Sequence, residues 1–451
     1  MTLNLFHTGR DATIVTPSTP RTYELAMTPF NPRPGPLIAA LSCLVALGST
    51  PASAQLLPSP SSIAGQAGLP LSGLPVVGRV TGDLDQIADR LTPEALAAAR
   101  LDRLSARVRT HPRALELDDR GQPVVRGEAL AVSPTAEALA RITAAGFAVA
   151  RQTTSEDLGL SLVTLTPPKG MSARAAVRRL RQIDPAGDYD FNHVYADAGQ
   201  GGAAASGVAG SAVGVGHGRA GLLDGGVAAD QPVFSRVKLQ QRGFAQGGAR
   251  PSPHGTATAS LIAAVGVDEI LVADVYGQGP TGGSAEAIVG ALSWMAQARV
   301  PVINISLVGP PNGALGAAVR ALVAKGCLIV AAVGNDGPAA PALYPASYPG
   351  VIAVTGVDRR RRLLPEAGRA AHVDFAAYGA EVRVAAPGGR PAEVRGTSYA
   401  APVVAARLAL LLDAPDPAGA QRAVAKLAAA AVDLGAPGVD PVFGKGFVEA
   451  N

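Results

Sequence analysis

Four residues of this sequence have the side-chain types that catalyse acyl transfer, and each stands where an apolar or helical run begins or ends. Asp224 ends the run AGLLD, His254 opens the helical stretch 254–264, and Asn335 ends the run LIVAAVGN. Ser398 stands at the start of the apolar helical stretch 397–412. Hydrolysis through an acyl-enzyme needs a hydroxyl nucleophile, a base that takes its proton and an acid that orients the base. Together, the four residues indicate a serine peptidase.

Each of the four also has an ordinary structural interpretation. An aspartate before two glycines is usually a turn residue, and a histidine that opens a helix is more often a cap or a surface group. Asn335 precedes Asp336 and Gly337, a typical turn sequence, and Ser398 could be a simple N-terminal helix residue. Only the set as a whole points to catalysis.

The tetrahedral intermediate of acyl transfer carries a negative oxygen, and two features of the sequence could stabilise it. A serine at a helix N-terminus brings its own backbone N–H to that oxygen, helped by the helix dipole. The NH2 group of an asparagine side chain can be the second donor, a role that an aspartate could not take.

The segments around these residues resemble the motifs of the subtilisin-like serine peptidases, the subtilase family, in which the triad follows the order Asp, His, Ser. The resemblance covers roughly residues 220–451. It rests on GLLDGGV at 221–227, HGTATA at 254–259, VINISL at 302–307, AAVGN at 331–335 and GTSYAAP at 396–402.

The resemblance implies a role for each matching residue. Ser398 would be the nucleophile, His254 the general base and then the acid, and Asp224 the orienting acid. Asn335 would donate to the oxyanion. The segment from Ser306 to Gly309 would pair with the backbone of a bound peptide by β-augmentation. The implied substrate-binding residues are Ser306, Leu307, Val308, Gly309, Ala332, Gly334 and Leu343, of which Leu343 is expected to favour small or medium apolar side chains.

The sequence departs from the family pattern in three places. Gly225 stands where Ser or Thr usually supports the aspartate, and Val308 stands where a glycine is common. The histidine helix runs almost directly into the next strand, without the longer calcium-binding loop of many relatives. No carboxylate cluster lies nearby. We therefore expect no calcium at this place, with a weaker site elsewhere as the alternative. No metal-ligand spacing of His or Cys occurs, and we expect no cofactor.

The elements that must position these residues form an α/β pattern. From about residue 211, short apolar runs alternate with helical runs, which is typical of a parallel sheet covered on both faces. In such sheets, functional groups gather where strands end and helices begin. The sequence predicts a three-layer subtilisin-like peptidase domain over residues 206–451.

A different pattern precedes that domain. Residues 93–108 have helical spacing, and between 123 and 195 the periodicity reads β-α-β-β-α-β, with Ser133 a candidate helix cap. This predicts a linker and helical pro-segment (55–115) and a ferredoxin-like α+β prodomain (116–200). By resemblance, the prodomain is an intramolecular inhibitor whose tail, near residues 192–200, blocks the cleft. An ordinary accessory domain is the alternative. The glycine-rich stretch 199–207 is expected to be a flexible linker.

The N-terminal residues predict that the protein is exported from the cytoplasm. Residues 36–47 are apolar but too short to span a bilayer, and Ala52-Ser53-Ala54 is a small-residue cleavage pattern. We interpret residues 1–54 as a signal peptide, with translation starting at Met27, and expect a periplasmic or extracellular protein. A buried core helix and a lipoprotein at Cys43 are the alternatives.

The net charge of the chain limits which classes of binding partner are expected. The net charge is only +4, which does not demand nucleic acid or an anionic membrane as partner. The run of four arginines at 359–362 fits a solvated loop better than a nucleic-acid patch. We expect protein or peptide substrates, no nucleic acid, no membrane span after signal removal, and a monomer.

Two other functions compete with an active endopeptidase. The departures at Gly225 and Val308 permit an inactive relative that acts as a binding module. A nucleotide-dependent α/β enzyme is disfavoured because the glycine-rich run 214–218 precedes its strand rather than following one.

Overall fold

The computed structural model describes residues 92–198 and 216–450, which we call the amino-terminal lobe and the carboxy-terminal lobe. Both lie within one compact unit, Val76–Asn451. The predicted signal peptide, the start at Met27, Cys43, and the linkers at 55–91 and 199–207 lie outside the described residues.

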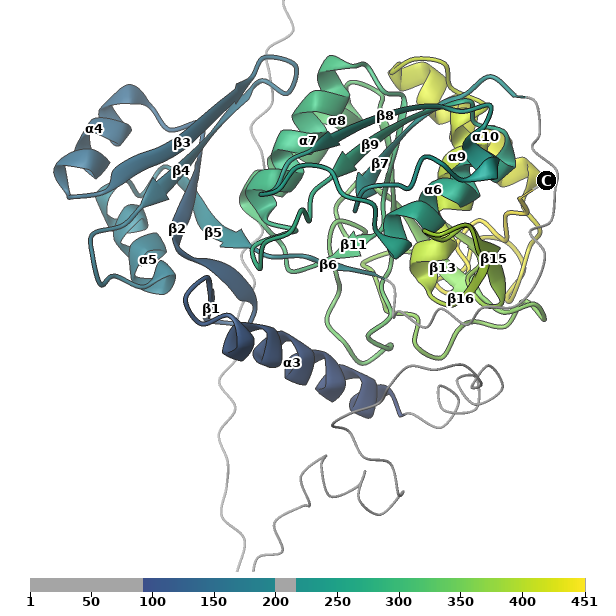
Figure 1. The fold of residues 1–451 in the computed structure, drawn as a ribbon, viewed down its shortest axis with the longest axis horizontal. Helices are drawn as coiled ribbons and strands as arrows, with labels where there is room; N and C mark the ends of the chain where they lie inside the picture. The colour runs from purple at the N-terminus through teal and green to yellow at the C-terminus, as the bar shows by residue number, and fades with distance from the viewer. Residues whose placement is uncertain (1–91, 199–215, 451) are drawn as a thin grey trace, which may run out of the picture. The chain divides into compact units, whose positions relative to one another are not determined.

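The carboxy-terminal lobe is built on a sheet of seven parallel strands in the order β14-β13-β12-β10-β7-β9-β8 (Figure 1). The central strands are buried except for the first residues of β7 and β9, which is why they read as apolar runs. Their bounds are β7 Arg219–Asp224, β8 Lys238–Gly243, β9 Glu269–Asp274, β10 Val302–Ile305, β12 Leu328–Ala332, β13 Ile352–Val357 and β14 Phe375–Tyr378.

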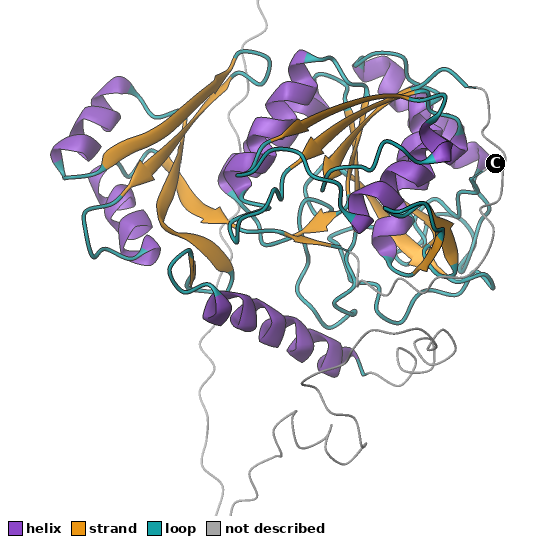
Figure 2. Ribbon diagram, in the orientation of Figure 1, coloured by secondary structure: helices purple, strands orange, loops and turns teal. Residues whose placement is uncertain are grey.

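Helices cover both faces of this sheet (Figure 2). One hydrophobic cluster joins the sheet to α6 (Pro253–Val265), α9 (Ala401–Ala409) and α10 (Pro417–Ala430). A second cluster joins the opposite face to α7 (Ala285–Gln297) and α8 (Gly313–Ala324). The three-layer α/β architecture predicted from the alternating runs is confirmed.

The amino-terminal lobe contains an antiparallel sheet whose strands follow the order β3-β4-β2-β5, with β1 also paired to β2. Helices α4 and α5 pack on its hydrophobic core, and α3 precedes it. The chain order β2-α4-β3-β4-α5-β5 is the predicted ferredoxin-like pattern. The bounds are α3 Pro93–Thr110, β1 Leu115–Leu117, β2 Pro123–Val132, α4 Ala136–Ala144, β3 Ala148–Ser155, β4 Leu160–Thr166, α5 Ala173–Ile183 and β5 Asp188–His193.

Ser133 does not cap α4, contrary to the prediction. The residue directly before the helix is Thr135, and its hydroxyl accepts a hydrogen bond from the N–H of Ala138 at 3.1 Å. Ser133 has a φ of 45° and instead accepts from the N–H of Ser161 in β4. An N-cap residue is extended, as Thr135 is with φ −69° and ψ 158°, whereas the left-handed backbone of Ser133 does not fit this role.

Ser398 does not open a continuous helix either. It lies in a short 3-10 turn, η2 (Thr397–Tyr399), and α9 begins only at Ala401. Pro402 has no N–H, so the carbonyl of Ser398 cannot accept an α-helical bond from it. That carbonyl accepts the hydroxyl of Ser306 instead, at 3.1 Å.

Candidate active site

The carboxyl end of β7 and the start of α6 bring Asp224 and His254 together. Nδ1 of His254 lies 2.9 Å from both carboxylate oxygens of Asp224. Asp224 is buried, with 1% of its surface exposed. Because the carboxylate can only accept, Nδ1 carries the proton and Nε2 keeps its lone pair.

Asp224 is held by two further groups. The N–H of Gly225 donates to Oδ1 at 2.7 Å. Oγ1 of Thr258 lies 3.2 Å from Oδ2 and 3.0 Å from the carbonyl of His254, so its one proton is shared between these acceptors. The sequence analysis missed Thr258. The spacing in the sequence could have indicated Thr258, because it follows His254 by one helical turn and so lies on the same side of α6.

Opposing effects act on the protonation of His254. Burial disfavours the charged imidazolium, but the charge of Asp224, the hydrogen bond to it and the charge of Asp197 outweigh burial and raise the pKa of His254. Its Nε2 is buried and has no hydrogen-bond partner among the described residues. The ring is thus oriented at one nitrogen and available as a base at the other.

Ser398 is also buried, and its Oγ has no hydrogen-bond partner within residues 92–198 and 216–450. The bond from Ser306 to its carbonyl fixes the turn. The serine therefore precedes α9 on a constrained 3-10 turn, with its hydroxyl unengaged.

The side-chain amide of Asn335 has one possible orientation. Its Oδ1 accepts the N–H of Thr397 at 2.9 Å, so Nδ2 is the atom that points the other way. That Nδ2 donates to the carbonyl oxygen of Ala198, at the end of the amino-terminal lobe. The structure thus places a peptide carbonyl on the amide donor that sequence analysis proposed for an oxyanion.

The chain leading to Ala198 lies along the predicted substrate strand. β6 (Ala196–Asp197) pairs antiparallel with β11 (Leu307–Val308). The two short strands lie next to each other in Figure 1. The N–H of Ala198 donates to the carbonyl of Ser306 at 2.9 Å. We call residues 195–198 the tail.

Gly309 pairs with Tyr344 rather than with the tail backbone. Its N–H and carbonyl both bond to Tyr344, at 2.9 and 3.0 Å. Gly309 contributes instead by lacking a side chain. A Cβ there would lie 2.4 Å from the ring of Tyr195.

Three of the other predicted pocket residues share a hydrophobic cluster with Ala198. Val308, Ala332 and Leu343 belong to the same buried hydrophobic cluster as Ala198. Leu343 and Val308 both lie against Gly334, the residue that directly precedes Asn335. Ala198 itself is buried, with 3% of its surface exposed.

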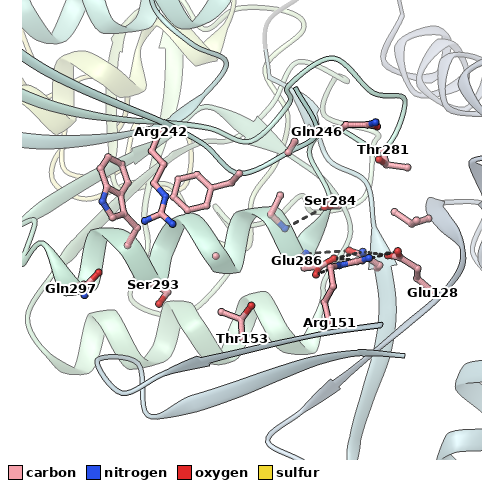
Figure 3. Close-up of a pocket in the computed structure, with 17 residues that line it drawn as sticks. Glu128, Arg151, Thr153, Arg242, Gln246, Thr281, Ser284, Glu286, Ser293 and Gln297 are labelled. Carbon is pink, nitrogen blue, oxygen red and sulfur yellow. Dashed lines mark hydrogen bonds and ion pairs between the residues drawn. The ribbon is translucent and has the colours of Figure 1, made fainter. Parts of the chain in front are cut away.

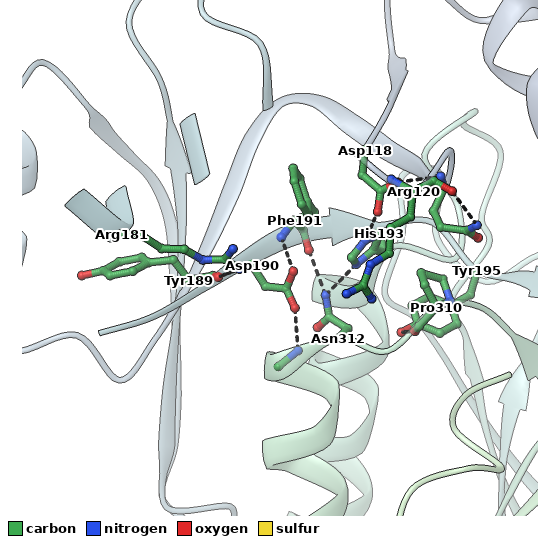
Figure 4. A network of polar contacts seen from close by, with 12 residues as sticks. Asp118, Arg120, Arg181, Tyr189, Asp190, Phe191, His193, Tyr195, Pro310 and Asn312 are labelled. Carbon is green, nitrogen blue, oxygen red and sulfur yellow. Dashed lines mark hydrogen bonds and ion pairs between the residues drawn. The ribbon is translucent and has the colours of Figure 1, made fainter. Parts of the chain in front are cut away.

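Polar contacts around Asn312 dock the amino-terminal lobe on α8 (Figure 4). Nδ2 of Asn312 lies 3.0 Å from Nδ1 of His193 and donates to the carbonyl of Phe191 at 2.9 Å. The N–H of Gly313, in the first turn of α8, donates to Asp190 at 2.7 Å. The negative side chain meets the positive end of the helix dipole, which is favourable.

A second contact lies at the start of α7 (Figure 3). Arg151 binds Glu128 of its own lobe and Glu286 of α7, each at 2.6 Å. Asn192 also donates to Glu128 and accepts the N–H of Glu286. Because β5 runs straight into the tail, contacts at both helices fix where the tail enters the cleft.

Among the described residues, no group of three or more His, Cys, Asp or Glu side chains could hold a metal ion. None of the helices in those residues is long and apolar enough to cross a membrane.

Comparison with known proteins identifies the family. The model of the subtilase family (Peptidase S8) matches residues 221–446, half of the chain. The chain therefore belongs to the subtilase family, and its carboxy-terminal lobe has the α/β subtilisin fold.

Curated relatives match part of the chain. Subtilisin DY of Bacillus licheniformis is 34% identical over 173 residues, covering 38% of this chain and 62% of that protein. The minor extracellular protease Epr of Bacillus subtilis is 31% identical over 207 residues, covering 44% and 32%. The chain thus spans less than two thirds of the length of these relatives.

A solved structure resembles more of the chain. Fervidolysin from Fervidobacterium pennivorans, described as a keratinolytic enzyme related to subtilisin, matches 74% of this chain and 61% of its own. The TM-score is 0.60 and the identity 18%. At that identity, the likeness concerns the fold alone.

Proposed function

We propose that this chain is the precursor of a serine endopeptidase that cleaves its own backbone after Ala198. The observation that carries the proposal is the position of the Ala198 carbonyl. It accepts Nδ2 of Asn335, while the residues before it pair with β11 as a substrate strand would. These contacts support a tail that binds as a substrate does, with the carbonyl to be attacked on the proposed oxyanion donor.

The chemistry follows from the residues around that carbonyl. Nε2 of His254 takes the proton of Ser398 Oγ, and Oγ bonds to the carbonyl carbon of Ala198. The resulting oxyanion is stabilised by Nδ2 of Asn335 and the backbone N–H of Ser398. When the C–N bond breaks, His254 returns the proton to the leaving amine of Gly199. Water then hydrolyses the acyl-enzyme by the same steps, with His254 again as base.

The amino-terminal lobe acts as an inhibitory prodomain in this proposal. After cleavage, the tail keeps its pairing with β11, and the contacts at α7 and α8 keep the lobe attached. A product held by so many contacts leaves slowly, so it blocks the cleft until the lobe is removed.

The proposal includes export and external substrates. The apolar segment 36–47 and Ala52-Ser53-Ala54 support a signal peptide, and hence a periplasmic or extracellular enzyme. Proteins or peptides would be its substrates, and the mature enzyme would act as a monomer without nucleic acid.

The proposal is tested by comparing the wild-type chain with Ser398→Ala, both expressed from Met27, by intact mass and N-terminal sequencing. We expect the wild type to yield a new N-terminus at Gly199 and the variant to keep its tail attached. A fluorophosphonate probe, which reacts only with an activated serine, gives an independent readout.

The outcomes separate the parts of the proposal. Probe labelling without cleavage after Ala198 would leave the peptidase and remove self-processing. Two intact, folded and unlabelled chains would instead make the protein an inactive relative that acts as a binding module.

A further inference from the structure

The side chain of Tyr195 is fully buried against the carboxy-terminal lobe, with 0% of its surface exposed. Tyr195 is the fourth residue before the proposed cleavage point, counting back from Ala198. Its N–H donates to the carbonyl of Gly283 at 2.8 Å, and its ring lies on the bare Cα of Gly309. The tail is thus anchored at this end by a side chain as well as by its backbone.

The buried end of the ring meets a specific polar group. The hydroxyl of Tyr195 donates to the carbonyl oxygen of Pro310 at 2.7 Å. Burial raises the pKa of Tyr195 well above its usual value, so the hydroxyl stays protonated and remains a donor. A hydroxyl in this place satisfies a carbonyl that an apolar ring would cover and leave unpaired.

The surroundings of the hydroxyl are fixed by the carboxy-terminal lobe. The ring of Tyr348 packs at a tilt against that of Tyr344, with centroids 4.5 Å apart. The Tyr348 hydroxyl is held by both the N–H and the carbonyl of Asn312, each at 2.8 Å. We call Gly283, Gly309, Pro310 and Tyr348 the tyrosine subsite. All four belong to the carboxy-terminal lobe and would remain after the amino-terminal lobe leaves.

We propose that the mature enzyme selects peptides with tyrosine, in preference to phenylalanine, at the fourth position before the cut. The inference rests on the proposed peptidase function. The discrimination comes from the carbonyl of Pro310, which pairs with the hydroxyl of tyrosine and loses that partner with phenylalanine. A subsite that recognised only apolar area would treat the two rings alike or favour phenylalanine, because phenylalanine costs less to desolvate.

The first position adds a second requirement. The methyl group of Ala198 shares a buried cluster with Val308 and Leu343. Ala198 is 3% exposed, so a larger side chain at this position would have to fit among buried neighbours. The substrate class is therefore peptides that carry tyrosine and, three residues later, alanine at the cut.

The test uses enzyme processed from the full chain and four coumarin amides that differ only at the first residue. They are Tyr-Ala-Asp-Ala, its phenylalanine and alanine analogues, and its 4-aminophenylalanine analogue, which keeps a donor at the ring end. We expect kcat/KM for tyrosine to exceed that for phenylalanine about tenfold, the effect of leaving one buried carbonyl unpaired. The 4-amino analogue should recover most of the difference.

Gly309→Ala provides a variant control, because the added methyl group would lie where the ring lies. It should reduce cleavage of the three ring-containing peptides toward that of the alanine analogue. Ser398→Ala gives the background rate.

The remaining outcomes are distinct. Equal kcat/KM for the tyrosine and phenylalanine peptides would overturn the inference while the peptidase stands. A large difference without recovery by the 4-amino analogue would also overturn it, since hydrogen donation would not be the cause. No cleavage of any peptide, together with no fluorophosphonate labelling of Ser398, would overturn the proposed function and this inference with it.

Discussion

Nε of Arg100 in α3 lies 3.0 Å from the carboxylate of Asp336, the residue that directly follows the proposed oxyanion donor Asn335. Both side chains are buried, with 7% and 10% exposed. Farther along α3, Arg107 donates to the carbonyls of Pro280 and Gly282, close to where the tail enters. The helix therefore contacts the carboxy-terminal lobe near both ends of the tail.

Loss of this buried ion pair is expected to destabilise the precursor. In a Ser398→Ala background, Arg100→Ala should lower the free energy of unfolding by about 3 kcal/mol, because Asp336 loses a buried partner. The control is Arg103→Ala, since Arg103 binds the same carboxylate but is 50% exposed. It should cost below about 1 kcal/mol. Urea unfolding measures both, and equal losses would contradict the assignment.

Removal of the Asn335 amide donor should slow the chemical step and leave binding largely unchanged. Asn335→Asp keeps the shape and an oxygen for the N–H of Thr397, but replaces Nδ2 by a second oxygen. We expect kcat to fall by about 10²- to 10³-fold, as for other oxyanion donors, with KM within about threefold of wild type. Near-normal kcat in the variant would exclude Asn335 from the oxyanion site.

The charge of Asp197 should affect the pH dependence of self-cleavage. Together with Asp224, it raises the pKa of His254 against the effect of burial, and only neutral His254 can act as base. Self-cleavage should therefore fall as the pH drops through that pKa. Asp197→Asn removes a negative charge and lowers the pKa of His254, so the acidic limb should move to lower pH.

The measurement for Asp197 is the rate of self-cleavage when the full chain is refolded from urea at a series of pH values. Asp119→Asn is the control, because Asp119 is an exposed carboxylate of the same lobe, paired with Arg178. A shift of the acidic limb to higher pH, or the same shift in the control, would contradict the assignment.

We expect full activity to require glycine at position 225, because Ser252 occupies the space beside it. A Cβ at position 225 would lie 2.3 Å from Oγ of Ser252, which caps α6 by accepting the N–H of Gly255. Gly225→Ser should lower kcat/KM about tenfold through overpacking next to Asp224. Adding Ser252→Gly should restore most of it, since glycine is an acceptable helix cap. No recovery in the double variant would contradict this explanation.

Much of the site was predictable because it depends on local signals. Asp224, His254, Asn335 and Ser398 each follow a buried strand or precede a helix, and parallel strands bring such ends to one edge of the sheet. The ferredoxin-like order was readable from periodicity alone. The capping residue of α4 was predicted wrongly because Ser133 and Thr135 have similar preferences.

Other features depend on contacts between distant segments. The carbonyl of Ser398, left free by Pro402, accepts the hydroxyl of Ser306, 92 residues earlier in the chain. Strand β8, with polar residues exposed at the edge of the sheet, lacked the apolar run that marked the inner strands. Thr258 was missed because a threonine inside an apolar helix has no local signal beyond its spacing.

The sequence by itself determined the side-chain chemistry, the order of the inner strands and of the helices between them, and the resemblance to the family. These depend on residue type and periodicity, which are properties of neighbouring positions. Only the tertiary structure decided that Ala198 meets Asn335, that Tyr195 reaches Pro310, and that Arg100 pairs with Asp336. Such pairs join segments more than a hundred residues apart, and their alignment is set by the packing of the two lobes rather than by any local preference.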